Sequence, residues 1–255
     1  MRAYAAFTAK EFTEFTWTYK LMIIGLVFLL FGIMSPLAAK FMPELLSSFM
    51  PEGMQITISD PTALDSWMQF EKNISQIGLF VVVILISGMM AGEYSRGTLI
   101  NVLTKGLSRR IVILSKFTAA VLLWTGAYLV CFGTAYVYTW FYWRKTVNMP
   151  GLAEAVFALW LFGVFLIAGT ILGGVLVRTS DGTLLFTGLA VVVQFLFNML
   201  PKAEKYNPIQ LAAGGTPLLQ GQLEAGSLVK PMIVAGICTV ACVAAACVVF
   251  DRKKL

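Results

Sequence analysis

Long apolar segments separated by short polar ones dominate this chain. The first covers residues 21–39, between Lys20 and Lys40, and holds no charged residue. At about 1.5 Å per residue a helix of this length is roughly 28 Å long, which matches a hydrocarbon core of about 30 Å. Five further apolar segments are of comparable length. The predicted membrane spans are residues 21–39, 74–90, 117–143, 152–177, 182–200 and 231–250.

This pattern predicts an all-α integral membrane protein with six transmembrane helices. The composition agrees, because 58% of the 255 residues are hydrophobic and 13% are charged, whereas soluble domains have about 25% charged residues. The first apolar segment is longer than the roughly 7–15 residues of a signal-peptide core, and it starts further from the N-terminus. We therefore expect a six-span domain in residues 21–255.

Residues 1–20 are expected to form an N-terminal helix in the membrane interface, because aromatic residues recur on one helical face with charges opposite. The alternative is a polar segment that simply precedes the first span and whose aromatic residues have no role in the interface. The aromatic face comprises Tyr4, Phe12, Phe15 and Tyr19, and Lys10 and Glu14 lie on the other face.

Loop charges predict the orientation. Residues 1–20, 91–116, 178–181 and 251–255 together hold twelve basic and five acidic residues, and the remaining segments hold seven and eight. Because Lys and Arg concentrate in cytoplasmic loops, the first set is predicted to be cytoplasmic. Both termini then lie inside a multi-pass protein of the cytoplasmic membrane. The basic residues are dispersed over loop ends, so nucleic acid is not an expected partner.

Several kinds of chemistry are disfavoured. The chain has no histidine, which removes His-based catalysis and His-ligated metals. Cys238 and Cys242 share a helix face, but their span has no further ligand, so packing is favoured over a metal site. The predicted spans hold almost no ionisable residue and none near the middle, where proton-coupled carriers usually have one. Residues 41–73 can form short helices on the outer surface. For residues 201–230, composition alone leaves open whether the outer segment dips back into the membrane.

The segment between the second and third spans carries the most distinctive pattern. Gly97 interrupts the second span, Thr98 can cap a short helix, and Gly106 can end it in a left-handed conformation. Ser108 can cap the next helix. An amphipathic helix of this kind suits docking to a cytoplasmic partner or anchoring in the interface. Its apolar face is formed by Leu99, Val102 and Leu103, and its polar face by Asn101, Thr104 and Lys105.

These residues resemble a family. Glu93-x-x-Arg96-Gly97-Thr98, Leu103-Thr104-Lys105-x-x-Ser108-Arg109 and Ser115-Lys116 are similar to the second cytoplasmic-side loop of ABC-2 type (ATP-binding cassette) export permeases, although Gly106 replaces the usual proline. Further similar stretches are Lys10–Phe12, Phe31–Pro36, Asp60–Leu64, Gln76–Phe80 and Tyr206–Pro208.

The resemblance implies a permease subunit of an exporter, which moves a substrate outward using ATP hydrolysis in a separate ATPase subunit. It implies a dimer with a second permease copy and a coupling helix around residues 98–105. The chain has no phosphate-binding loop, so no cofactor is expected in it, and ATP and Mg would bind the partner. The alternative is a membrane scaffold or assembly protein without transport activity. The residues expected to contact the ATPase are Glu93, Arg96, Gly97, Thr98, Leu99, Val102, Leu103 and Arg109.

Overall fold

A computed structural model gives the architecture of the chain and describes residues 2–49, 60–98, 104, 106, 108–144 and 146–253. Every regular element in these residues is helical. In chain order they are α1 (Arg2–Trp17), α2 (Lys20–Phe49), α3 (Ala63–Asn73), the π-helix η1 (Ile74–Gly78), α4 (Leu79–Arg96), α6 (Arg109–Tyr142), α7 (Leu152–Val177), α8 (Ser180–Asn198), α9 (Pro201–Glu204), α10 (Gln210–Ala213), α11 (Gly215–Leu219) and α12 (Val229–Arg252).

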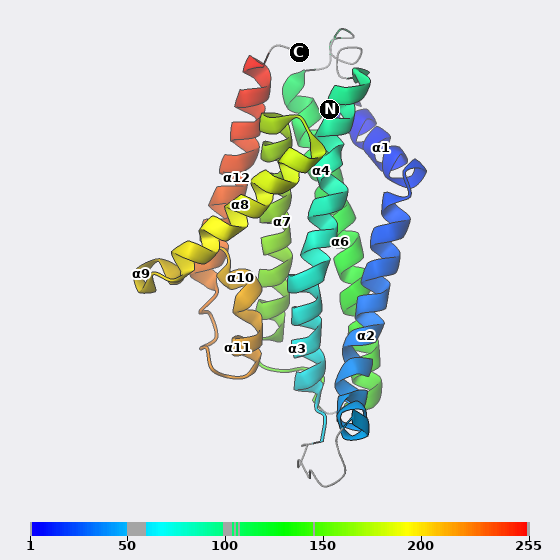
Figure 1. Cartoon of the computed structure of the whole chain (residues 1–255), viewed down its shortest axis with the longest axis vertical. Helices are drawn as coiled ribbons and strands as arrows, with labels where there is room; N and C mark the ends of the chain where they lie inside the picture. The colour runs from blue at the N-terminus through cyan, green and yellow to red at the C-terminus, as the bar shows by residue number, and fades with distance from the viewer. Residues whose placement is uncertain are drawn as a thin grey trace.

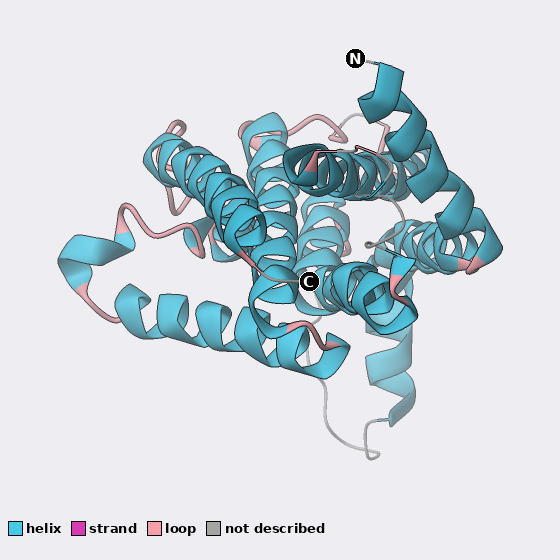
Figure 2. Cartoon of the chain, turned by 90° about the horizontal axis from the view of Figure 1, so that it is seen from above, coloured by secondary structure: helices cyan, strands magenta, loops and turns pink. Residues whose placement is uncertain are grey.

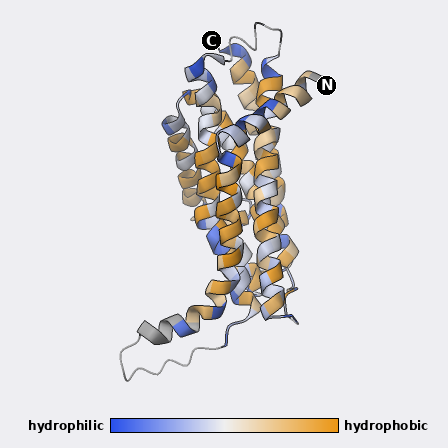
Figure 3. Ribbon diagram, turned by 90° about the vertical axis from the view of Figure 1, so that its right-hand side faces the viewer, coloured by the Kyte–Doolittle hydropathy of each residue, from blue (hydrophilic) through white to orange (hydrophobic). Residues whose placement is uncertain are grey.

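Six helical stretches in the described residues are long and apolar enough to cross a membrane, which confirms the predicted fold class and number of spans. They form one elongated bundle in which α1 and the end of α12 lie at the same end, called here the terminal end (Figure 1). Hydrophobic residues cover the middle of this bundle (Figure 3). The candidate spans are Lys20–Met42, Ala63–Arg96, Arg109–Tyr142, Leu152–Val177, Ser180–Asn198 and Val229–Arg252.

The second span differs from the prediction. Helix α3, expected as part of an outer-surface segment, continues through η1 directly into α4. Its apolar face explains the difference, because Trp67 and Phe70 are fully buried against α6. The Trp67 ring stacks on Phe132 at 5.6 Å between centroids, and the Phe70 ring meets Tyr128 edge-on at 5.9 Å. Burying two large aromatic rings is a strong reason for α3 to join the bundle.

The longer helix also corrects the expectation that the spans hold almost no ionisable residue. Glu71 and Glu93 lie toward the two ends of the Ala63–Arg96 stretch, and Lys116 lies near the start of α6. All three side chains are buried. Neither carboxylate oxygen of Glu71 has a hydrogen-bond partner among the described residues.

Helix α7 is the central element, packed against α4, α6, α8 and α12. A close approach joins it to α6. A Cβ atom added at Gly163 would lie 2.4 Å from Cε2 of Trp124, so only a glycine fits beneath this indole ring. The indole Nε1 of Trp124 donates a hydrogen bond to the carbonyl oxygen of Trp160 (3.0 Å). Small residues of this kind allow two membrane helices to come close.

Among the spanning helices of the described residues, α4 and α7 are the two against which α8 packs substantially. With α9 it reaches out to one side of the bundle (Figures 1 and 2). The segment after α9 returns to the bundle, where α10 and α11 pack against α7. Its apolar residues Ile209, Leu211 and Leu218 are buried. This segment therefore forms part of the bundle at the end opposite the terminal end.

Candidate functional site

A cluster of charged side chains joins three helices at the terminal end of the bundle. We call it the charge cluster. Helix α1 lies there across the ends of α2 and α6, and it contacts both. The charge cluster consists of Lys10, Glu11 and Glu14 from α1, Glu93 and Arg96 from α4, and Lys116 from α6.

Lys116 is the centre of the charge cluster. Its side chain is 1% exposed, and its Nζ donates to both carboxylate oxygens of Glu11 at 2.9 Å. The same Nζ donates to Oε1 of Glu93 at 3.1 Å. A buried ammonium group is costly unless it is paired and hydrogen-bonded. These contacts satisfy that requirement and connect α6 to α1 and α4.

Lys10 forms the outer layer of the charge cluster. Its Nζ lies 2.6 Å from Oε1 of Glu93, 2.8 Å from Oε2 of Glu14 and 3.2 Å from Oε1 of Glu11. Burial alone would lower the pKa of Lys10, but hydrogen bonds to Glu14 and Glu93 and the charge of Glu11 outweigh it and raise the pKa above its ordinary value. Arg96 completes the cluster with Nη1 3.6 Å from Oε1 of Glu14.

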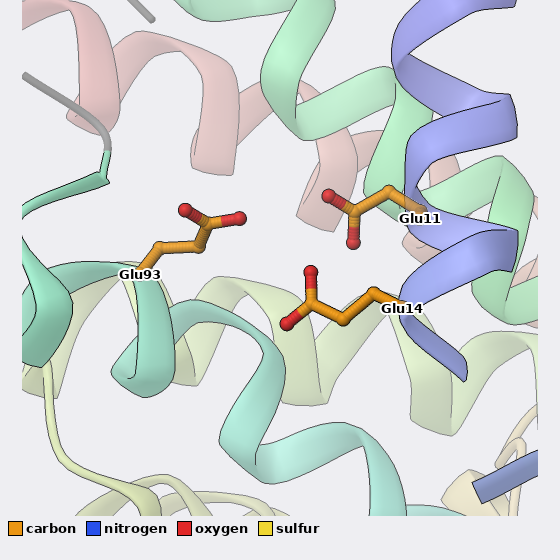
Figure 4. Close-up of side chains that lie close together, drawn as sticks. All are labelled: Glu11, Glu14 and Glu93. Carbon is orange, nitrogen blue, oxygen red and sulfur yellow. The ribbon is translucent and has the colours of Figure 1, made fainter. Parts of the chain in front are cut away.

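The three carboxylates point toward one another from α1 and α4 (Figure 4). Their nearest oxygen atoms all lie within 4.8 Å of one another, which is close enough to share a metal ion. However, the ammonium groups of Lys10 and Lys116 already bind these oxygens. Three carboxylates face two lysines and one arginine, so the cluster is neutral. The arrangement is a set of ion pairs that hold helices together.

Glu93 also connects the charge cluster to the loop that follows α4. Gly97 ends α4 in the left-handed conformation (φ 64°), which favours glycine. The Oγ1 hydroxyl of Thr98 then donates to Oε2 of Glu93. Of the predicted ATPase contacts, Leu99, Val102 and Leu103 lie outside the described residues. The predicted coupling helix is therefore untested.

Arg109, one of the predicted ATPase contacts, makes hydrogen bonds to the C-terminal end of α12. Its Nη1 donates to the carbonyl oxygens of Phe250 (2.8 Å) and Lys253. These carbonyls end α12, where a cation stabilises the free acceptors and the negative end of the helix dipole. Ser108 caps α6 as predicted, because its side chain accepts a hydrogen bond from the amide of Ile111. Arg109 thus fastens the C-terminal end of α12 to the start of α6.

Sequence reasoning missed the central pair of the charge cluster. It placed Lys10 and Glu14 on the face of the N-terminal helix opposite the aromatic residues, and it named Glu11 only within the family-like stretch Lys10–Phe12. The available signal was the spacing of Phe7, Glu11 and Phe15, one helical turn apart, because a carboxylate within an apolar stripe requires a buried partner. All three residues are buried.

Comparison with known proteins shows the family to which this chain belongs. A family model described as ABC-2 family transporter protein matches residues 6–255. The chain therefore belongs to this family of transporter membrane proteins, which confirms the resemblance seen in its loops. A curated relative is the uncharacterized transmembrane protein YxlG of Bacillus subtilis (strain 168), which is 20% identical over 215 residues, covering 83% of each chain.

Proposed function

We propose that this chain is the permease subunit of an ABC exporter and moves a substrate outward using ATP hydrolysis by a separate ATPase subunit. Family membership supports the coarser part of this function, since ABC-2 permeases are membrane subunits without a catalytic ATPase domain. The family also implies association with an ABC ATPase. In this proposal two permease copies form the membrane part, and ATP and Mg bind the partner.

The observation that carries the proposal is the position of Glu93. It binds Lys10 of α1, Lys116 of α6 and Thr98 of the loop. The loop of residues 97–108 is thus bordered by helices held to one another at its base. A displacement of this loop by a docked ATPase would reach α1, α4 and α6 together rather than bend one helix alone.

The loop charges support the orientation. With Lys and Arg concentrated on the cytoplasmic side, the terminal end of the bundle faces the cytoplasm, where ATP is available. In this orientation the charge cluster lies at the cytoplasmic membrane face. Arg96 and Thr98 lie beside the docked ATPase, and the apolar face of Leu99, Val102 and Leu103 enters a groove on it.

A pair of charge substitutions on the loop tests this docking. The double variant Leu99→Asp/Leu103→Asp places two carboxylates on the apolar face, where burial against a partner would be costly. We expect loss of co-purification with the ATPase and loss of its stimulation. The matched control Asn101→Asp/Thr104→Asp adds the same charges to the opposite face and is expected to retain both. Equal retention by the two variants, with transport in proteoliposomes unchanged, would show that this face does not dock.

A further inference from the structure

A cavity of about 580 Å³ lies at the end of the bundle opposite the charge cluster. It is bounded by α2, by α3 with η1, and by α10 and α11. The side chains from α2 and α10 are apolar, and most of the amide, hydroxyl and charged side chains come from α3 and η1. The lining residues that matter here are Met42, Lys72, Gln69, Gln76, Ala213 and Thr216.

The side-chain ammonium group of Lys72 is the charged group of this cavity that can bind a ligand. Its side chain is exposed and makes no ion pair or hydrogen bond within the described ranges. Asp65, which also lines the cavity, is already engaged, because its Oδ2 accepts hydrogen bonds of 2.8 Å from the amide and the hydroxyl of Thr62. Asp65 keeps its negative charge, but its Oδ2 is held by Thr62, whereas the ammonium group of Lys72 has no partner among the described residues and is available to an incoming ligand. An anionic group is the complement of this arrangement.

The outer surface of the same helix continues from the cavity as an apolar stripe. Lys72 and Gln76 are exposed, and on the next two turns Phe80 is 68% and Ile84 56% exposed. Polar residues thus give way to large apolar ones along a single exposed face. This change from polar to apolar side chains matches the boundary between lipid headgroups and hydrocarbon. At that boundary a lysine side chain can place its stem among apolar groups and its charge among polar ones.

We propose that the cavity binds the headgroup of an anionic phospholipid, with Lys72 as the counter-charge to its phosphate. Gln69, Gln76 and Thr216 supply hydrogen bonds to the headgroup and ester oxygens, and one acyl chain lies along Phe80 and Ile84. A lysine suits this position, because its stem can pack among apolar groups while its charge meets the phosphate. The volume exceeds what a carboxylate alone would fill, which favours a phospholipid over a fatty acid. This site does not depend on the transport function proposed above.

Lipid titration of the full-length purified protein tests the proposal. The protein is prepared in an uncharged detergent and titrated with dioleoylphosphatidylglycerol, and bound lipid is counted by native mass spectrometry. We expect Lys72→Ala to weaken binding about five- to tenfold and Lys72→Arg to retain it. Lys202→Ala removes another exposed lysine, in α9, and is expected to bind as the wild type does.

A second variant tests the cavity without changing charge. Ala213→Trp fills the space beside Lys72 and is expected to lose the same bound lipid. If Ala213→Trp does not fold, the Lys72 series alone decides the question. Wild-type binding by both Lys72→Ala and Ala213→Trp would overturn the proposal. Equal binding of dioleoylphosphatidylcholine, or binding of oleate in place of the phospholipid, would overturn it as well.

Discussion

Replacing Lys116 with methionine keeps the length of the side chain and removes its charge. In the wild type its Nζ makes two contacts of 2.9 Å to Glu11 and one of 3.1 Å to Glu93. Removing one partner of a buried ion pair costs about 3–5 kcal/mol, because the other charge stays buried. Lys10 still binds both carboxylates, at 3.2 and 2.6 Å, so we expect a loss at the low end, about 3 kcal/mol.

Equilibrium unfolding in mixed SDS and detergent micelles measures this loss. The double variant Glu11→Gln/Lys116→Met removes both members of the pair and is expected to be more stable than Lys116→Met alone, since no unmatched carboxylate remains. The coupling energy from the full double-mutant cycle should be about 1–3 kcal/mol. Lys205→Met, at an exposed lysine, is the control and should unfold as the wild type does.

Two results would refute this reasoning. Unfolding of Lys116→Met at the wild-type midpoint would mean that the ion pairs contribute no net stability. Additive effects of Glu11→Gln and Lys116→Met would mean that the two side chains do not act as a pair, despite their contact distances.

Three further predictions concern close packing and charge. Gly163→Ala is expected to destabilise the protein by about 1–3 kcal/mol, because its methyl group would overlap the indole ring of Trp124. The control Gly169→Ala has open space around it and should cost nothing. Equal effects of the two substitutions in SDS unfolding would contradict the close approach of α6 and α7 at Gly163. Gly215→Ala is expected to cost less, about 1 kcal/mol, because its Cβ would lie 2.4 Å from Oε2 of Glu71, at the end of a side chain that can turn away. Glu71→Gln should unfold close to the wild type, because no described partner is lost, and a large loss would reveal a partner for the carboxylate. Burial raises the pKa of Glu14, but the hydrogen bond and the charge of Lys10 lower it by more, so the pKa lies below the ordinary 4.5. The stability that Glu14 contributes is therefore present above pH 4.5 and is lost as the pH falls through the lowered pKa. The difference in unfolding midpoint between the wild type and Glu14→Gln should shrink with acidification, and a constant difference would contradict an ionic role.

The six spans could be predicted because long apolar segments have one stable solution in a bilayer, which is a helix that satisfies its own backbone hydrogen bonds. The predicted range 152–177 coincides with α7 (Leu152–Val177). Helix α3 was not predicted as part of a span because Asp65, Gln69 and Lys72 give it a polar side. Its membership in the bundle depends on the burial of Trp67 and Phe70, and such tertiary contacts are not visible in hydropathy.

The candidate site was predictable in part. Glu93 was singled out by the resemblance to the ABC-2 family and Thr98 because it follows the glycine that interrupts the second span, and the structure brings these two side chains into contact. The pairing of Glu11 with Lys116 was not predictable, since the two residues are 105 positions apart. Local spacing shows that Glu11 needs a partner, but only the packing of α1 across α6 determines which cation it is.

The π-helical turn η1 has a consequence for how the two ends of the molecule communicate. The helix from Ala63 to Arg96 is about 50 Å long, with Lys72 on one side of η1 and Glu93 on the other. A π turn holds an extra residue compared with an α turn, and such turns occur frequently at functional sites. Passing that extra residue along the helix would rotate one half against the other by about 100°. A change of register at η1 would therefore turn α3, which carries Lys72, relative to α4, whose far end is fixed by the ion pairs of Glu93.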